Sequence, residues 1–224
     1  MGKRPAVDSS APPVEAVVFD VGGVLIDWNP RHLYRKLIDD AAEMERFLAE
    51  VCTQDWNEQA DAGRPTAAIT AELAARHPDK RELIESYYAR FDEMMMGALD
   101  DTVTLLEQLH GQGMPLYVLS NFSAETFPLA ERRFPFFQRF AGLVISGAEG
   151  LKKPDPRIYK RLTGRYGLTP QRTLFIDDRH DNAEAARAAG WQALRFTSAQ
   201  RLADDLAALG LLAPATGAAE GSGA

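Results

Sequence analysis

The chain has 224 residues, 46% of them hydrophobic and 25% charged, with a formal net charge of -7. That length suits one large core domain with a smaller insertion. The negative charge argues against nucleic acid or an anionic membrane as the main partner, and no apolar run reaches the roughly 18 residues of a membrane span. We therefore expect a cytoplasmic protein with a small-molecule partner, either a monomer or a homodimer.

The first predicted strand, residues 16–19, follows a Pro- and Ser-rich segment, 1–14, that we expect to be disordered. The strand runs directly into Asp20, and Gly22 and Gly23 come next. In an open α/β sheet, ligands bind beyond the carboxyl ends of the strands. Asp20 is therefore a candidate site residue; the alternative is an aspartate that only accepts hydrogen bonds in a turn.

A long segment follows before the next apolar run, far more than one crossover requires. Apolar residues recur at helical spacing over four stretches, 31–40, 42–52, 65–76 and 79–96. We expect residues 30–98 to form a helical cap, and residues 15–29 and 99–212 to form the core domain.

Three side chains between the first two predicted strands are candidates for contact with a ligand. Arg64 follows a glycine in a predicted turn, and its planar guanidinium suits phosphate or sugar hydroxyls. Trp28 and Trp56 either line a pocket of the cap or pack in its core. A solvated surface position is the alternative for Arg64.

Four more strands are predicted in the second half of the chain, at residues 116–119, 143–145, 173–176 and 193–196. Helical patterns over 101–110, 156–166 and 182–189 separate them. Strands that alternate with helices predict βαβ units and a mostly parallel sheet. The Ala- and Gly-rich end, 213–224, is predicted to be disordered.

Polar residues follow these strands as well. Ser120 and Asn121 follow the second strand, Lys153 comes in the loop after the third, and Asp177 and Asp178 follow the fourth. Each could be a helix cap or turn residue. Because the carboxyl ends of parallel strands meet at one edge of the sheet, we expect these side chains to share one crevice with the end of the first strand.

In their order along the chain and in their residues, these segments resemble the four motifs of the haloacid dehalogenase-like hydrolase superfamily, over about residues 14–212. The motifs are Phe19-Asp20-Val21-Gly22-Gly23-Val24, Leu119-Ser120-Asn121, Lys153-Pro154-Asp155-Pro156-Arg157-Ile158-Tyr159 and Phe175-Ile176-Asp177-Asp178-Arg179. The resemblance implies an α/β fold: a Rossmann-like parallel sheet of order 5-4-1-2-3, with an α-helical cap inserted between the first two motifs.

Within the superfamily the chain most resembles the phosphatases that act on glucose 1-phosphate and similar sugar phosphates. That finer likeness depends on Asp27, Trp56-Asn57, Asp61-Ala62-Gly63-Arg64, Met95, Gly97, Ser120-Asn121-Phe122-Ser123 and the block Asp177 to Asn182. It implies a Mg²⁺-dependent phosphatase of small phosphorylated metabolites, sugar 1-phosphates among them.

The resemblance also implies roles for the motif residues. Asp20 would be the covalent nucleophile, and Lys153 would offset the charge of the phosphate. Mg²⁺ would be held by Asp20, Asp178 and the carbonyl of Gly22, because this ion prefers oxygen ligands. Asp177 would hold a ligand water or Lys153.

The second motif and the cap are expected to bind the substrate. The Ser120 hydroxyl and the amide of Asn121 would donate to phosphate oxygens and hold the group in line with the nucleophile. Arg64 and Trp56 are the predicted contacts from the cap.

The chain departs from the family pattern at Gly22, where most phosphatases of the superfamily have a second aspartate that protonates the leaving oxygen. General acid assistance is typically worth about 10²- to 10⁴-fold. Without it, hydrolysis should depend steeply on the leaving group and favour an anomeric sugar hydroxyl. His180, Asp181, a water molecule or a substrate hydroxyl are the alternatives for the proton donor.

Two other functions remain open at this stage. A haloacid dehalogenase would use the same aspartate nucleophile and also lacks the second aspartate, but dehalogenases need no metal and typically have Ser-Asn where this chain has Asp177-Asp178. Two further acids would repel the carboxylate of a haloacid. A binding protein that has lost catalysis is the third hypothesis.

Overall fold

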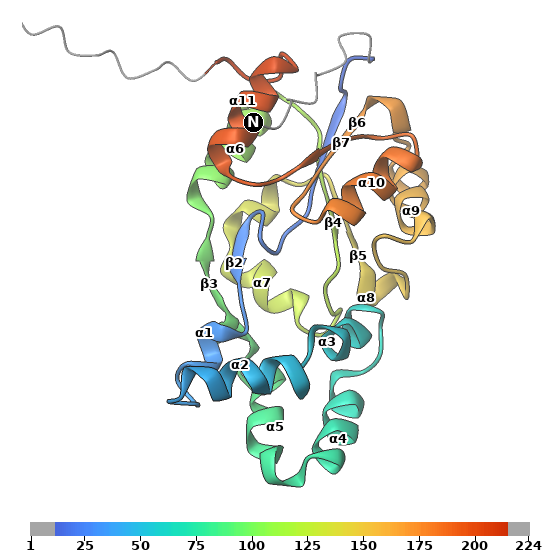
Figure 1. Ribbon diagram of the computed structural model, residues 1–224. Coiled ribbons are helices and arrows are strands. Elements are labelled where there is room, and N and C mark those ends of the chain that lie inside the picture. The colour runs from blue at the N-terminus through green and yellow to red at the C-terminus, as the bar shows by residue number, and fades with distance from the viewer. Residues whose placement is uncertain (1–11, 215–224) are drawn as a thin grey trace, which may run out of the picture.

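The fold is built on one five-stranded parallel sheet, seen in the upper half of the computed structural model in Figure 1, which describes residues 12–214. Most of the two predicted disordered tails, 1–14 and 213–224, lies outside the described residues. The strand order is β5-β4-β1-β6-β7, which, read from β7, is the predicted order 5-4-1-2-3. The strands are β1 (Ala16–Phe19), β4 (Leu116–Ser120), β5 (Gly142–Ile145), β6 (Thr173–Asp177) and β7 (Gln192–Arg195).

Helices cover both faces of this sheet, which is why its central strands β1, β4 and β6 are buried and largely apolar. Along β1, Val17 and Phe19 belong to one hydrophobic cluster, and Ala16 and Val18 belong to the other. The first cluster includes residues of α6 (Asp100–Gly111), α7 (Phe127–Arg133) and α11 (Ala199–Ala208). The second includes residues of α9 (Pro156–Tyr166) and α10 (His180–Ala188). The core is therefore a three-layer α/β/α arrangement.

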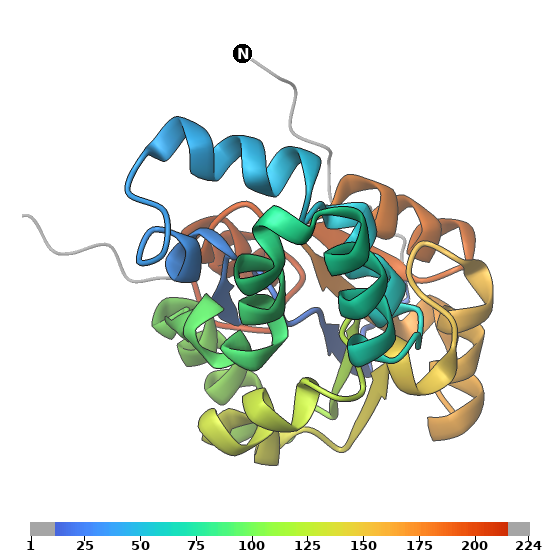
Figure 2. The same ribbon diagram turned by 90° about the horizontal axis from the view of Figure 1, so that it is seen from below.

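The segment between β1 and β4 leaves the sheet through a two-stranded antiparallel ribbon of β2 (Ile26–Trp28) and β3 (Met95–Ala98). The helices between these strands lie beyond the carboxyl ends of the sheet, below it in Figure 1 and in front of it in Figure 2. They are α1 (Arg31–Tyr34), α2 (Ala41–Glu50), α3 (Gln54–Asp61), α4 (Thr66–Arg76) and α5 (Arg81–Ala89). We refer to these five helices as the cap helices.

The cap departs from the predicted elements in three places. The helix expected over 31–40 is wrong in its second half, because α1 ends at Tyr34 and a turn follows it. The expected helix over 79–96 is wrong in its second half: α5 ends at Ala89, a 3-10 turn covers Phe91–Met94, and Met95 starts β3. The predicted helix does not continue to residue 96 because β3 pairs with β2. This pairing satisfies backbone groups that would otherwise form helical hydrogen bonds. Helix α3 was not predicted.

Helix α3 begins because the Thr53 hydroxyl accepts a hydrogen bond from the Trp56 amide at 3.1 Å. After the helix, the chain turns at Gly63, which has φ +96°, and a Cβ atom there would lie 3.0 Å from the carbonyl oxygen of Gly147 in the core. The glycine thus allows both the turn and a close approach of cap to core.

Two further features of the described chain concern its cysteine and the apolar character of its helices. Cys52 is buried, and burial raises the pKa of its thiol to about 12, so it is neutral. Within residues 12–214, none of the helices has the length and apolar character needed to cross a membrane.

The remaining elements are short and lie in loops of the core and of the cap. Helix α8 (Ser146–Glu149) follows β5 directly, and Ser146 is fully buried between cap and core. Short 3-10 turns complete the chain at Pro78–Lys80, Pro135–Arg139 and Pro170–Arg172.

Candidate active site

Asp20 lies at the carboxyl end of β1, where the amide of Asp20 donates to the carbonyl of Ile176 at 2.9 Å. Its carboxylate Oδ1 accepts hydrogen bonds from the Ser120 hydroxyl at 2.9 Å and from the Val21 amide at 2.7 Å. The ammonium of Lys153 is 2.9 Å from the same oxygen. Groups from three strand ends therefore meet at one carboxylate, as the parallel topology requires.

Lys153 is a buried cation with only 2% of its surface exposed. Its Nζ donates to Asp177 at 2.7 Å and to the Leu119 carbonyl at 2.8 Å. The Asn121 side chain fixes the lysine backbone, accepting from its amide at 2.8 Å and donating to its carbonyl at 2.9 Å. Burial lowers the pKa of Lys153, but the ion pairs with Asp177 and Asp20 outweigh it and hold the pKa above its ordinary value.

Three carboxylates crowd this point. Asp20, Asp177 and Asp178 each offer an oxygen, and these oxygens lie within 4.8 Å of one another. Burial raises the pKa of Asp20 to about 7, opposed by Lys153, and burial with the charge of Asp177 raises the pKa of Asp178. Like charges held this close favour a bound cation.

The donor set fits a hard divalent ion such as Mg²⁺, which takes oxygen ligands and keeps several waters. The amide nitrogen of Asn182 donates to both oxygens of Asp177, at 3.0 and 3.1 Å. Its buried Oδ1 has no hydrogen-bond partner among residues 12–214, so a further oxygen acceptor faces this group. Asp20, Asp178 and the Gly22 carbonyl are the residues that would hold the ion.

The two glycines after Asp20 differ in what they require. Gly23 has φ +74°, and a Cβ atom there would lie 2.9 Å from Oδ2 of Asp178. A Cβ atom at Gly22 would have nothing within 4 Å, and φ there is not positive. Glycine is therefore needed at position 23 for the approach of Asp178, whereas position 22 has room for a side chain.

A cavity of about 320 Å³ opens in front of these groups, between the sheet and the cap helices. Of the predicted site residues, Asp20, Gly22, Asn121 and Asp178 line it. Ser120, Lys153 and Asp177 are buried around Asp20. The remaining lining residues are Gly23, Trp28, Gln54, Asn57, Glu58, Asp61, Phe91, Phe122, Arg179 and Asn182.

Arg64 and Trp56, the predicted substrate contacts from the cap, do not line this cavity. Arg64 is an exposed side chain paired with Glu72 at 2.5 Å. Trp56 is 4% exposed, packs edge-on against Tyr87 at 5.0 Å, and donates from Nε1 to the Ile69 carbonyl at 3.1 Å. The guanidinium of Arg64 thus has its partner on the surface, and the indole of Trp56 has its partner in the core of the cap.

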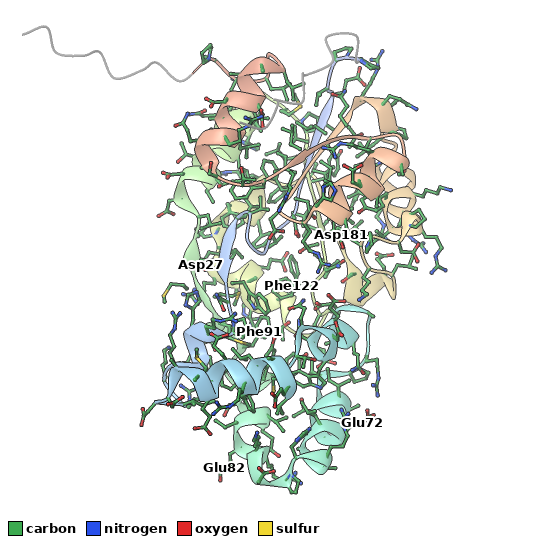
Figure 3. The ribbon with its side chains drawn as sticks, viewed as in Figure 1. Asp27, Glu72, Glu82, Phe91, Phe122 and Asp181 are labelled. Atoms are coloured by element: carbon green, nitrogen blue, oxygen red, sulfur yellow. The ribbon has the colours of Figure 1, made fainter. Side chains whose placement is uncertain are left out.

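Other residues of the cap take that place. Neighbouring helical residues point about 100° apart, so α3 turns Trp56 into the cap while Asn57, Glu58 and Asp61 line the cavity. Phe91 and Phe122, labelled in Figure 3, lie where cap and core meet, with ring centroids 5.7 Å apart. From the sequence, Asn57, Asp61 and Phe122 were noted only for their family likeness and were not expected at the cavity, since no signal there showed which side of α3 faces the core.

Trp28 and the two residues considered as alternative proton donors differ in their relation to the cavity. Trp28 lines the cavity, and its buried Nε1 finds no hydrogen-bond partner in the part of the chain that the structure describes. His180 and Asp181, considered as proton donors, are exposed and do not line the cavity; Asp181, labelled in Figure 3, pairs with Arg179 at 2.9 Å.

A parallel α/β sheet whose strand ends converge on an aspartate, a buried lysine and two further aspartates defines a class of hydrolases. The sequence model of the haloacid dehalogenase-like hydrolase family matches residues 14–190, and the chain belongs to this family. A sesquiterpene phosphatase of Aspergillus oryzae is 28% identical over 82% of this chain and 90% of its own length.

Solved structures share the fold at low identity. A haloacid dehalogenase family enzyme from Bacteroides thetaiotaomicron, solved with magnesium and inorganic phosphate, has a TM-score of 0.63 and 20% identity over 83% of this chain and 95% of its own. The L-2-haloacid dehalogenase of Xanthobacter autotrophicus has a TM-score of 0.59 and 17% identity over 86% of this chain and 82% of its own. The fold alone therefore does not distinguish phosphatase from dehalogenase.

Proposed function

We propose that the protein is a Mg²⁺-dependent phosphatase of small phosphorylated metabolites, sugar phosphates in particular, that works through an aspartyl-phosphate on Asp20. The observation that carries the proposal is the group of three carboxylates, Asp20, Asp177 and Asp178, beside the buried cation of Lys153. The phosphatase among its relatives and the magnesium and phosphate of the Bacteroides enzyme are consistent with it.

The residues divide the reaction between them. Mg²⁺, when bound, would neutralise charge on the transferring phosphoryl group. Asp20 attacks phosphorus, since a carboxylate can replace one difficult displacement by two easier ones. Lys153 favours the ionised form of Asp20 and offsets the phosphate charge, while Ser120 and the Asn121 amide orient phosphate oxygens. Asp177 holds the lysine in place through the 2.7 Å ion pair.

The cavity supports a polar metabolite as the substrate. Gln54, Asn57 and Glu58 line its cap side, and its volume of about 320 Å³ suits a small molecule. These groups match hydroxyls of a sugar better than a long apolar chain. The substrate class is therefore a phosphorylated sugar, with sugar 1-phosphates as the first to test.

The dehalogenase reading fits these residues less well. A haloacid brings its own carboxylate, and Asp177 and Asp178 would place two more negative charges beside it. A phosphate ester is also anionic, but a divalent cation held by those acids would offset its charge. The two acids thus favour the metal-dependent reaction.

A substrate screen tests the proposal. Phosphorylated metabolites, including glucose 1-phosphate and glucose 6-phosphate, and the haloacid 2-chloropropionate are each incubated with Mg²⁺ or with EDTA. We expect phosphate release that needs Mg²⁺ and is lost in the Asp178→Ala variant, whose far-UV circular dichroism remains that of the wild type. Full activity in EDTA, or chloride release without metal, would contradict the proposal. No turnover of any compound would favour a binding protein.

A further inference from the structure

We propose that Asp61, at the end of cap helix α3, is the general acid and base of this enzyme, a role that rests on the phosphatase function proposed above. In the first step it would protonate the leaving oxygen of the ester, and in the second it would take a proton from the attacking water. The cap would then supply the proton donor that the first motif lacks at Gly22.

The position of Asp61 carries the inference. It lines the same cavity as Asp20, and it belongs to cap helix α3, whereas Asp20 ends a strand of the core. Its backbone carbonyl accepts a hydrogen bond from the Ser146 hydroxyl at 2.5 Å, which ties this end of α3 to the core. The side chain is therefore fixed relative to the site and does not depend on a mobile segment.

The other acids of the cavity are committed elsewhere. Among the described residues, four carboxylic side chains line it: Asp20, Glu58, Asp61 and Asp178. Asp20 and Asp178 belong to the nucleophile and the metal group. Glu58 forms ion pairs with Lys152 and Arg179; burial opposes these pairs, but they lower its pKa, so it remains ionised. Asp61 is the acid left to carry a proton.

The surroundings of Asp61 suit a carboxyl group that is protonated near neutral pH. Only 7% of the residue is exposed, and burial, followed by the charge of Glu58, raises the pKa of Asp61 to about 7. The Asn57 amide donates to its Oδ2 at 3.2 Å, and the Tyr88 hydroxyl in turn donates to Asn57 at 3.0 Å. A general acid is most effective when its pKa lies near the working pH.

Open space at Gly22 completes the argument. A Cβ atom there would have nothing within 4 Å, so steric crowding does not explain why this position lacks an acid. The room beside the nucleophile is part of the cavity, and Asp61 faces that cavity from the opposite side.

The two steps balance. Asp20 forms a bond to phosphorus, the bond from phosphorus to the leaving oxygen breaks with its electron pair on oxygen, and the proton of Asp61 neutralises that oxygen to give the alcohol. A water oxygen then attacks the aspartyl-phosphate, its proton passes to the Asp61 carboxylate, and the phosphorus–oxygen bond to Asp20 breaks. Phosphate leaves, and both aspartates return to their starting states.

The test compares leaving groups in the full-length enzyme with Mg²⁺. Asp61→Asn should lower kcat/KM for an alkyl ester, 2-phenylethyl phosphate, by about 10²- to 10⁴-fold. The same variant should lower it less than about tenfold for 2,4-dinitrophenyl phosphate, whose leaving group needs no proton. Glu82→Gln, an equally mild change on the exposed face of α5 (Figure 3), is the control and should leave both rates unchanged.

A second variant separates proton transfer from structural damage. Gly22→Asp places an acid in the open space beside the nucleophile, so it should restore alkyl-ester hydrolysis at least tenfold in the Asp61→Asn background. In the wild type the same substitution should not raise that rate by as much as about 10²-fold, because Asp61 already donates the proton. This last comparison does not require Asp61→Asn to fold.

Several outcomes would overturn the inference. Equal losses for both esters in Asp61→Asn, no loss for either, or a gain above about 10²-fold from Gly22→Asp in the wild type would each do so. Failure of the proposed function looks different: the wild type itself would hydrolyse no phosphate ester with Mg²⁺, and both proposals would fall.

Discussion

The Lys153 ammonium lies between two carboxylates, 2.9 Å from Asp20 and 2.7 Å from Asp177, with no side-chain surface exposed. Lys153→Met removes this charge and leaves two buried acids facing each other. Breaking a buried ion pair typically costs about 3–5 kcal/mol, so we expect a loss of that size in the free energy of unfolding, measured by urea in EDTA, together with severe loss of activity. An unfolding free energy equal to the wild type would contradict this account.

Asp20→Asn tests the nucleophile without that structural cost. The change removes one of three crowded negative charges and keeps the size of the side chain, so the fold should remain at least as stable. Activity should disappear, and the aspartyl-phosphate trapped from the wild type by rapid acid quench should be absent. If a tenth of the activity survives, the nucleophile is another residue.

The neighbouring glycines offer a matched pair. Gly23→Ala adds a methyl group where φ is +74° and only 2.9 Å separates it from Asp178. The positive φ costs about 1–2 kcal/mol, and displacement of Asp178 should raise the Mg²⁺ concentration for half-maximal activity about tenfold, the equivalent of about 1.4 kcal/mol. Gly22→Ala, in open space, should shift that concentration much less. Equal shifts in the two variants would argue against a metal role for Asp178.

Among the elements, helix α3 has the most direct bearing on the site, since it carries Asn57, Glu58 and Asp61. Thr53→Ala removes the hydroxyl that accepts from the Trp56 amide at 3.1 Å and should cost about 0.5–2 kcal/mol of unfolding free energy. Thr53→Ser keeps a hydroxyl that can accept this hydrogen bond at the start of α3, and it is the control. A Thr53→Ala protein as stable as the control would mean that the cap helices, and not this bond, fix the start of α3.

The strands of the core sheet could be predicted from the sequence because each depends on local pattern, whereas helices α7 and α11 were not predicted. The run before Asp20 is apolar throughout, since helices cover both faces of β1, and the topology then brings Ser120, Lys153 and Asp177 to one edge. The end of α5 could not be predicted in this way. It depends on pairing between Met95 and Trp28, residues far apart in the chain, and helical periodicity carries no information about that contact.

The cap side of the site was missed for a related reason. Asp61 and Arg64 are close in sequence, yet Asp61 is buried against the core and Arg64 pairs with Glu72 on the surface. Which side of α3 faces the cavity depends on how the cap contacts the core at Gly63, Gly147 and Ser146. The chemistry of the side chains favoured Arg64 as the substrate contact, and only the packing of cap against core shows that Asp61 lines the cavity instead.

At the scale of the whole molecule, core and cap contribute different parts of one site. The strand ends of the core hold Asp20, Lys153 and the metal group, whereas the cap encloses the substrate and brings in Asp61. Contacts such as the ion pair of Glu58 with Lys152 join the two parts across the cavity. A charge placed on the cap therefore affects both catalysis and the stability of the whole fold.

This coupling predicts how stability depends on pH. Burial raises the pKa of Asp61 from its ordinary value of 3.8 to about 7, so between these values the folded protein binds a proton that the unfolded chain has released. The contribution of Asp61 to stability is complete below pH 3.8 and is lost as the pH rises to 7, at up to about 1.4 kcal/mol per pH unit. Asp61→Asn does not titrate, so its unfolding free energy should increase relative to the wild type over this range.

The measurement is a series of urea unfolding curves for wild type and Asp61→Asn between pH 4 and 8, with and without Mg²⁺. Other carboxylates titrate in both proteins, so the difference between the two curves isolates Asp61. Mg²⁺ should leave that difference unchanged, because Asp61 is not among the residues that would hold the ion. Parallel curves would mean that Asp61 ionises as readily in the folded protein as in the unfolded chain, and a carboxyl group of that kind could not keep the proton that the leaving oxygen needs.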